Sequence, residues 1–250
     1  MLQIAFDIGG TFTDFAVCDT RDGRVQIWKV PTSLAPADAV MASLQERVRD
    51  GALDPGAVRG VLHATTIATN AILERKGSRT ALITTRGFRD ILLIGRQKRY
   101  DTNNLHLDKP VPLVARADIV EITERCGPDG AVLTPLDEAE AVALADRIAE
   151  GGYDAVAVVL LHAYANAAHE QRLAEILAAR APGVGVALSS VISPKFREYE
   201  RTSTTVANAY IQPLVSSYLR SLGGSLDALG IGAGISVMQS NGGLVSSELA

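Results

Sequence analysis

The segment at residues 7–14, with the sequence Asp-Ile-Gly-Gly-Thr-Phe-Thr-Asp, brings carboxylates, hydroxyls and two adjacent glycines together. A glycine carries no side chain, so its backbone N–H group can approach a phosphate closely. Threonine hydroxyls add hydrogen-bond donors, and the carboxylate of Asp7 can hold a magnesium ion through a bound water molecule. We therefore predict a phosphate-binding loop. Its expected contacts are Gly9, Gly10, Thr11, Thr13 and Asp14.

A plain hairpin turn is the alternative for this segment, because adjacent glycines also suit tight turns. The number of polar groups exceeds what a turn requires, and this favours the phosphate loop. The sequence contains neither a G-x-x-x-x-G-K-[ST] segment nor a G-x-G-x-x-G that leads from a strand into a helix. The loop is therefore of neither the P-loop nor the dinucleotide-binding type.

A second polar cluster follows the apolar run that ends at His63. Thr65, Thr66 and Asn70 come at the end of an expected strand and the start of an expected helix, where α/β proteins bind anions. Capping of the helix needs only one of these side chains and is the alternative. His63 fits a packed, hydrogen-bonded residue as well as a catalytic one.

Arginines mark two further segments. A guanidinium group at Arg96, beside Gln97, suits a carboxylate or a phosphate, whereas a solvated loop is the alternative. The neighbouring Lys98 and Arg99 are expected on the surface. The segment at 195–205 holds two arginines and two glutamates that could tie a long helix to the preceding domain. We favour this architectural role over that of a catalytic base.

Three short apolar runs at the N-terminus, at residues 2–6, 15–18 and 25–30, are separated by turn signals and predict an antiparallel meander. Strand and helix patterns then alternate, which is typical of an α/β fold with parallel strands. We expect the following strands to join the meander in one mixed sheet: 58–63, 80–84 and 155–161.

Helical periodicity and capping signals predict the connecting helices, with Thr134 as the N-cap of one of them. A long helix at 202–222 is expected to bend or restart near Pro213. Glycines at 223–224 and 230–234 predict a flexible joint, followed by a strand at 235–239. The other expected helices lie at 39–48, 66–75, from about 88, at 136–150 and at 166–179, and a further strand at 184–188.

Composition is that of an ordinary globular protein: 47% of the 250 residues are hydrophobic and 21% are charged. The formal net charge of −4 lacks the basic excess of nucleic-acid-binding proteins, so no nucleic acid partner is expected. No apolar run is long enough to span a bilayer, and no membrane association is expected. A small-molecule role is favoured.

Cysteines and histidines add no expected site. Cys18 and Cys126 are too few for a disulfide framework, which indicates a reducing, cytoplasmic location. Neither has an adjacent base that would make a reactive thiol. The four histidines show no paired spacing typical of metal ligands, so Asp7 is the one metal ligand that we expect.

Long segments of the sequence resemble the hydantoinase A and 5-oxoprolinase family. The opening Ile-Ala-Phe-Asp-Ile-Gly-Gly-Thr-Phe-Thr-Asp is one of them, and His-Ala-Thr-Thr-Ile-Ala-Thr-Asn is another. The resemblance covers nearly the whole chain in ordered blocks. These blocks lie at residues 4–14, 63–77, 87–90, 95–97, 197–205 and 238–243.

The resemblance implies an actin-like ATPase fold, in which two lobes of ribonuclease-H type hold ATP and Mg²⁺ between them. Members open a cyclic amide such as 5-oxoproline or a hydantoin, with ATP activating the carbonyl oxygen. Others serve as the ATP-using subunit of acetone- or acetophenone-type carboxylases. By this resemblance Asp7, Thr66 and Asn70 would be catalytic, with Asp7 on the metal. Thr65, Arg96 and Gln97 would bind substrate.

Domain organisation and partners also follow from the resemblance. Residues 1–194 would form the N-terminal lobe, and residues 195–250 an interlobe helix and the start of a second lobe. The family carries a second Asp-x-Gly-Gly-Thr loop that this sequence lacks, so we expect it to be part of something longer. The expected partner is the second lobe or a subunit of hydantoinase B type, in an oligomer.

A lobe that binds a partner and turns over nothing is the alternative in a different class. A partner would cover an apolar stripe of the long helix that we expect to be exposed in this chain. The stripe consists of Val206, Tyr210, Leu214, Tyr218 and Leu222.

Overall fold

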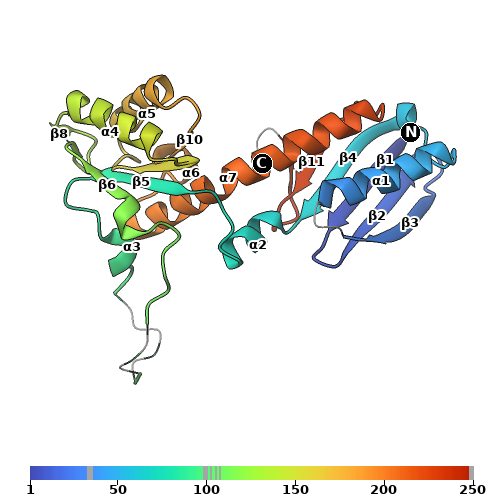
Figure 1. The fold of residues 1–250 in the computed structure, drawn as a ribbon, viewed down its shortest axis with the longest axis horizontal. Coiled ribbons are helices and arrows are strands. Elements are labelled where there is room, and N and C mark those ends of the chain that lie inside the picture. Colours follow the sequence, from blue (N-terminus) through green and yellow to red (C-terminus); the bar gives the residue numbers. More distant parts are fainter. Residues whose placement is uncertain (33–35, 98–100, 102, 105, 107, 248–250) are drawn as a thin grey trace. The chain divides into compact units, whose positions relative to one another are not determined.

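The computed structural model describes residues 1–32, 36–97, 101, 103–104, 106 and 108–247 (Figure 1). The chain divides into two units, of which the first combines Met1–Asn70 with Leu214–Ala250 and the second is Ala71–Pro213. The divisions fall inside helices α2 (Ile67–Leu73) and α7 (Glu198–Ala228). The lobes expected at residues 1–194 and 195–250 concern the whole family protein and stay a prediction.

A six-stranded mixed sheet forms the frame of the first unit, in the order β12-β11-β4-β1-β2-β3. The first three strands pair antiparallel, so the predicted meander is confirmed. β4 and β11 run parallel to β1. The strands are β1 (Leu2–Ile8), β2 (Phe12–Asp19), β3 (Val25–Pro31), β4 (Val58–Thr65), β11 (Ile235–Met238) and β12 (Leu244–Ser246).

One face of this sheet packs on α1 (Pro36–Arg49) and on the C-terminal half of α7 (Figure 1). Alternation along β1 explains which side chains are covered, since Ile4, Phe6 and Ile8 are buried and Asp7 between them is exposed. On α7, Leu222 and Leu226 pack into the same core. The one-turn helix η1 (Pro55–Ala57) leads into β4.

The second unit has its own sheet, with four parallel strands in the order β10-β9-β5-β6. The prediction that strands 80–84 and 155–161 join the first sheet is therefore wrong. Both are buried along their whole length, as is usual for parallel strands covered on two faces, and such runs do not indicate their partner. The strands are β5 (Thr80–Thr85), β6 (Ile119–Ile122), β9 (Ala155–Val159) and β10 (Gly185–Leu188).

Helices cover both faces of this second sheet (Figure 1). α4 (Glu138–Glu150) and α5 (Ala168–Arg180) pack on one face, and the N-terminal half of α7 packs on the other. Asp137 caps α4 by accepting a hydrogen bond from the Glu140 N–H at 2.9 Å, so the expected cap at Thr134 is wrong. Thr134 instead ends a hairpin strand. The remaining elements are α3 (Ile91–Ile94), η2 (Arg116–Asp118), β7 (Arg125–Cys126), β8 (Val132–Thr134) and α6 (Ser189–Ile192).

Helix α7 runs for 31 residues and differs from expectation in two ways. It continues through Gly223 and Gly224, where a joint was predicted, because packing on the first core supplies the stability that glycine lacks. Its apolar stripe is not exposed: Val206 is 2% exposed, Tyr210 7% and Leu222 0%. Within the described part of the chain, no helix combines the length and the hydropathy that a bilayer crossing demands.

His63 lies on the covered face of the first sheet and is completely buried. The Tyr218 hydroxyl of α7 donates a hydrogen bond to His63 Nε2 at 2.8 Å, and the centre of the His63 ring lies 4.6 Å from that of Phe6. Burial lowers the pKa of His63 to about 4. Of the two roles considered for this residue, the structure favours the packed one.

This burial predicts an acid-sensitive first unit. In the unfolded chain His63 has its ordinary pKa of 6.5, so below that pH the unfolded state binds a proton that the fold excludes. We expect the free energy of unfolding to fall by roughly 3 kcal/mol between pH 6.5 and pH 4, with no such contribution above pH 6.5. Urea unfolding followed by fluorescence of Trp28, the one tryptophan of the chain, measures this fall.

Two variants test the assignment. His63→Gln removes the titration, so its stability should depend less on pH over this range than that of the unaltered chain. Tyr218→Phe removes only the hydrogen bond and should cost about 1 kcal/mol at every pH. Equal pH dependence in the His63→Gln variant and the unaltered chain would contradict the prediction.

Candidate functional site

The parallel strands β1, β4 and β11 end at the same edge of the first sheet. Ile8 at the end of β1 pairs with Thr65 at the end of β4, and Val237 near the end of β11 pairs with His63. Carboxyl ends of parallel strands are where α/β proteins gather their ligand-binding loops. The two polar clusters predicted at 7–14 and 63–70 therefore come together, and the β11–β12 turn joins them.

The turn between β1 and β2 is shaped by its two glycines. The Gly9 N–H donates to the Phe12 carbonyl at 3.0 Å, and a Cβ atom at Gly9 would lie only 3.0 Å from that oxygen. At Gly10 an added Cβ would meet nothing within 4 Å, so the backbone there faces open space. Gly10 and Thr11 are exposed. The turn thus has the room that a phosphate group requires.

Thr13 holds this turn in place. Its side chain is fully buried, and its hydroxyl lies 3.1 Å from that of Thr32. The Thr32 hydroxyl donates to the Gly9 carbonyl at 2.9 Å, and the Thr32 N–H donates to the Thr11 carbonyl at 2.9 Å. The geometry therefore gives the Thr13 side chain a positioning role, where the sequence suggested a phosphate contact.

Two carboxylates lie side by side next to the turn. Asp7 and Asp14 are neighbours in the β1–β2 register, and both are exposed on the face opposite the core. Asp14 forms an ion pair with Lys29 at 3.0 Å. No ion pair involves Asp7 within the described residues. Exposed carboxylate oxygens of this kind are the donors that Mg²⁺ prefers, so Asp7 fits the predicted metal ligand.

The start of α2 orders the second cluster. The Thr65 hydroxyl oxygen accepts a hydrogen bond from the Ile67 N–H at 3.2 Å, which is the capping role considered above. The Asn70 side-chain amide donates to the Thr66 hydroxyl at 3.2 Å. Thr66 and Asn70 are exposed, so this pair is accessible at the edge of the sheet.

The β11–β12 turn brings polar residues that the sequence reasoning left without a role. Gln239, Ser240 and Asn241 follow β11 directly, and the Asn241 side chain accepts from the Gly243 N–H at 2.8 Å. Gly242 adopts a φ of 82°, which a tight turn needs. In the sequence, the hint of a site was the run of amide and hydroxyl residues after an expected strand. The local sequence does not show that this strand, β11, pairs with β4.

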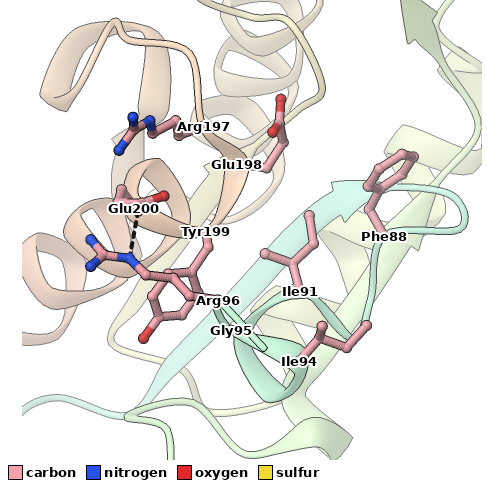
Figure 2. A pocket seen from close by; sticks show the side chains of 9 residues that line it. All are labelled: Phe88, Ile91, Ile94, Gly95, Arg96, Arg197, Glu198, Tyr199 and Glu200. Carbon is pink, nitrogen blue, oxygen red and sulfur yellow. Dashed lines mark hydrogen bonds and ion pairs between the residues drawn. The ribbon is translucent and has the colours of Figure 1, made fainter. Parts of the chain in front are cut away.

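Arg96 belongs to the second unit, where it lines a pocket of about 400 Å³ (Figure 2). Its Nε donates to a Glu200 carboxylate oxygen at 2.7 Å. This contact joins the two arginine-containing segments singled out in the sequence. The Glu200 backbone N–H and the Arg96 guanidinium hold the pKa of Glu200 below its ordinary value. The lining residues are Phe88, Ile91, Ile94, Gly95, Arg96, Arg197, Glu198, Tyr199 and Glu200.

Gln97 follows the pocket residue Arg96 and is exposed, with its backbone in the left-handed region at a φ of 56°. The structure describes no contact that would assign it to a substrate, and its expected role stays a prediction. Lys98 and Arg99, which were expected on the surface, lie outside the described residues.

Arg201 supports the architectural role of its segment. It is 1% exposed, and its Nη1 donates to the Ser189 hydroxyl at 2.7 Å. That hydroxyl donates in turn to the buried Glu170 carboxylate at 2.6 Å. Burial lowers the pKa of Arg201 from its ordinary value. The side chain thus anchors α7 within the second unit.

Comparison with known families gives two matches, which residues 182–200 separate. Residues 3–181 match the model described as hydantoinase/oxoprolinase N-terminal region, and residues 201–250 match the model described as hydantoinase/oxoprolinase. Together these ranges cover most of the chain. They include the candidate residues at 7–14, 63–70 and 96–97, whereas the pocket residues 197–200 lie between the two matches.

Three curated relatives are similar over nearly the whole chain. The caprolactamase alpha subunit of Pseudomonas jessenii is 33% identical over 97% of the chain, which spans 36% of that protein. The acetophenone carboxylase gamma subunit of Aromatoleum aromaticum is 33% identical over 96% of the chain, which spans 35% of that protein. The 5-oxoprolinase of Saccharomyces cerevisiae is 33% identical over 98% of the chain, which spans 22% of that protein.

Solved structures are similar in fold. The ATP-dependent caprolactamase of Pseudomonas jessenii superposes with a TM-score of 0.83 at 32% identity, covering 98% of this chain and 36% of that one. Nucleotide-free acetone carboxylase superposes with a TM-score of 0.86 at 24% identity, covering 98% of this chain and 37% of that one. The α/β fold with a mixed sheet is thus shared, and the chain spans about a third or less of the relatives it matches.

The two threonines behind the β1–β2 turn yield a stability prediction. Thr32→Val leaves the buried Thr13 hydroxyl and the Gly9 carbonyl without their partner, so we expect a loss of about 1–3 kcal/mol in urea unfolding. Thr13→Val leaves the bond from Thr32 to Gly9 intact and should cost less. In the double variant the two losses should not add, because the variants share one contact. Additive losses would show that the hydroxyl pair is not formed.

Proposed function

The chain belongs to the hydantoinase/oxoprolinase family, and we propose that it forms the N-terminal part of an ATP-dependent amidohydrolase. Its substrate would be a cyclic amide of the 5-oxoproline or hydantoin type. The observation that carries the proposal is the meeting of the β1–β2 turn, the β4–α2 junction and the β11–β12 turn at one sheet edge. These loops supply open backbone, hydroxyls, amides and an exposed carboxylate in one place.

In this proposal the β1–β2 turn receives phosphate. Gly9, Gly10 and Thr11 offer backbone N–H groups and one exposed hydroxyl, while Thr13 fixes the turn from behind. Asp7 holds Mg²⁺ or its bound water, because a carboxylate beside phosphates is repelled unless a cation lies between them. Asp14, paired with Lys29, flanks the same site. When bound, ATP supplies the phosphoryl group that activates the amide oxygen.

The β4–α2 junction would orient the reacting amide. Thr66 and Asn70 are exposed and hydrogen-bonded to one another, so their hydroxyl and amide are held in one geometry. Such fixed donors can stabilise the charge that develops on an oxygen during the reaction. The Thr65 hydroxyl oxygen caps the helix, and its hydroxyl proton would donate a hydrogen bond to substrate.

The pocket around Arg96, within the second unit, is also proposed to bind substrate. A guanidinium group can form two parallel hydrogen bonds to a carboxylate such as that of 5-oxoproline. In the pocket Arg96 already bonds to Glu200, which holds the guanidinium in a defined orientation (Figure 2). Gln97, the next residue along the chain, would add an amide donor.

The relatives are longer than this chain, and two of them are subunits. The caprolactamase and acetophenone carboxylase relatives are subunits by name, and this chain spans 36% and 35% of them. The sequence holds a single Asp-x-Gly-Gly-Thr segment, at residues 7–11. We expect ATP turnover to need a second lobe and a subunit of hydantoinase B type, in an oligomer, and the 250 residues alone to bind ATP weakly.

An ATP-using carboxylase subunit is the second candidate, favoured by the similarity to the acetophenone carboxylase gamma subunit. The two candidates differ in what stimulates ATP hydrolysis by the whole protein with its partner. Stimulation by 5-oxoproline or hydantoins supports the amidohydrolase, and stimulation by a ketone with bicarbonate supports the carboxylase. Stimulation by neither supports a lobe that only binds a partner.

Asp7 provides the decisive mutation. Asp7→Asn keeps the shape of the side chain and removes its charge, so amide-dependent ATP turnover by the whole protein should fall at least about 100-fold. Stability should change by less than about 0.5 kcal/mol, because Asp7 is exposed. The assay is phosphate release, with urea unfolding in parallel.

The matched control is Asp22→Asn, the same chemical change in the exposed β2–β3 turn, where Asp22 forms an ion pair with Arg24. This variant should retain full turnover. If Asp7→Asn also retained turnover within about twofold, Asp7 would have no part in the reaction.

A further inference from the structure

Three side chains with different donor atoms meet inside the second unit. Glu124 follows β6, Cys126 lies in β7, and His169 lies in the first turn of α5. Their nearest donor atoms, a carboxylate oxygen, a thiol sulfur and an imidazole nitrogen, all lie within 4.8 Å of one another. Glu124 is 4% and Cys126 1% exposed, and the His169 side chain is 12% exposed.

The donors converge on one nitrogen of the imidazole. His169 Nδ1 lies 2.8 Å from a Glu124 carboxylate oxygen and 3.6 Å from Cys126 Sγ. One ring nitrogen carries either a proton or a lone pair, so it cannot serve as donor to both neighbours at once. A cation held between the three atoms would satisfy all of them.

The sulfur–nitrogen distance and the charges suit a divalent transition-metal ion. Tetrahedral zinc, with Zn–S of about 2.3 Å and Zn–N of about 2.0 Å, places sulfur and nitrogen about 3.5 Å apart. The observed 3.6 Å matches that spacing, whereas the 2.8 Å between Glu124 and His169 would widen to about 3.3 Å around the ion. One carboxylate and one thiolate would neutralise the double positive charge of the ion, which is what a buried position requires.

The carboxylate is already oriented for such a role. The Leu161 N–H donates to the Thr85 hydroxyl oxygen at 2.8 Å, so the Thr85 proton is directed to Glu124 Oε1. This leaves Oε2, the oxygen beside His169, free of that bond. Hydrogen-bonded outer partners of this type fix the ligands of metal sites.

The backbone at Cys126 is fixed as well. Its carbonyl lies 2.8 Å from Nδ1 of His162, a residue whose backbone is in the left-handed region at a φ of 57°. A non-glycine residue adopts this conformation at an energetic cost, so the surrounding structure must favour it.

We propose that Glu124, Cys126 and His169 bind one divalent transition-metal ion, with Zn²⁺ as the best match. The mixture of thiolate, imidazole and carboxylate selects Zn²⁺ over Mg²⁺, which prefers oxygen donors alone. Three protein ligands leave one position for a water molecule. The ion would cross-link the β6–β7 segment to α5, and the site is separate from the Asp7 ligand proposed for Mg²⁺.

Cobalt(II) tests the site, because a cobalt–thiolate bond gives a charge-transfer absorption that carboxylate and imidazole ligands do not give. The purified chain is stripped with a chelator, and Co²⁺ is then titrated. We expect one Co²⁺ per chain, with the thiolate band. Cys18→Ser, the matched control at the other thiol, should keep the band, since Cys126 is then the one cysteine left.

Variants of the cluster complete the test. Cys126→Ser should lose the band and bind at least about 10-fold more weakly, and His169→Gln should also weaken binding. Zn²⁺ should raise the melting temperature of the unaltered chain and of Cys18→Ser, but not of Cys126→Ser. Absence of a thiolate band in Cys18→Ser would overturn the proposal. This outcome can be read without altering any of the three proposed ligands. A band that persists in Cys126→Ser would overturn it as well.

Discussion

The parallel pairing of β1 with β4 is the constraint on which the candidate site depends. It places Ile8 beside Thr65, so the turn after one strand and the helix after the other must open at the same edge. β11, paired parallel to β4, adds its own turn there, although more than 160 residues separate the two strands along the chain. The hydrogen bond from Tyr218 to His63 and the hydroxyl pair of Thr13 and Thr32 hold this arrangement from the covered side.

Local patterns predicted most strands and helices, because alternation and helical period are set by which face is buried. They could not predict that β5 and β9 form a second sheet, since runs buried on both faces carry no information about their partner. The helix at Gly223 and Gly224 was missed for a related reason: packing on a distant core outweighs a local propensity. Thr13 was predicted as a ligand by its type, whereas its burial follows from strand alternation.

The second unit shows how polar side chains can occupy a parallel α/β core. Glu170 accepts hydrogen bonds from Leu160 N–H and Ser189, and Arg201 donates to that same serine. Glu124, bonded to Thr85 and His169, forms a neighbouring group near the end of β5. Each carboxylate is buried only because its oxygens have partners, since an unpaired buried charge would cost several kcal/mol. Sequence spacing gave no hint of either group, because their members lie on different elements.

Helix α7 contributes to two cores with one continuous run of backbone: Val206 and Ala209 pack in the second unit, and Leu222 and Leu226 in the first. Each added or deleted residue turns the rest of a helix by about 100°. An added or deleted residue between Val206 and Ala209, or between Leu222 and Leu226, would therefore rotate one member of the pair away from its core, whereas a substitution keeps the spacing. During divergence these two stretches of the helix should accept changes of residue type while their spacing stays constant, and insertions should accumulate in exposed turns such as that between β2 and β3.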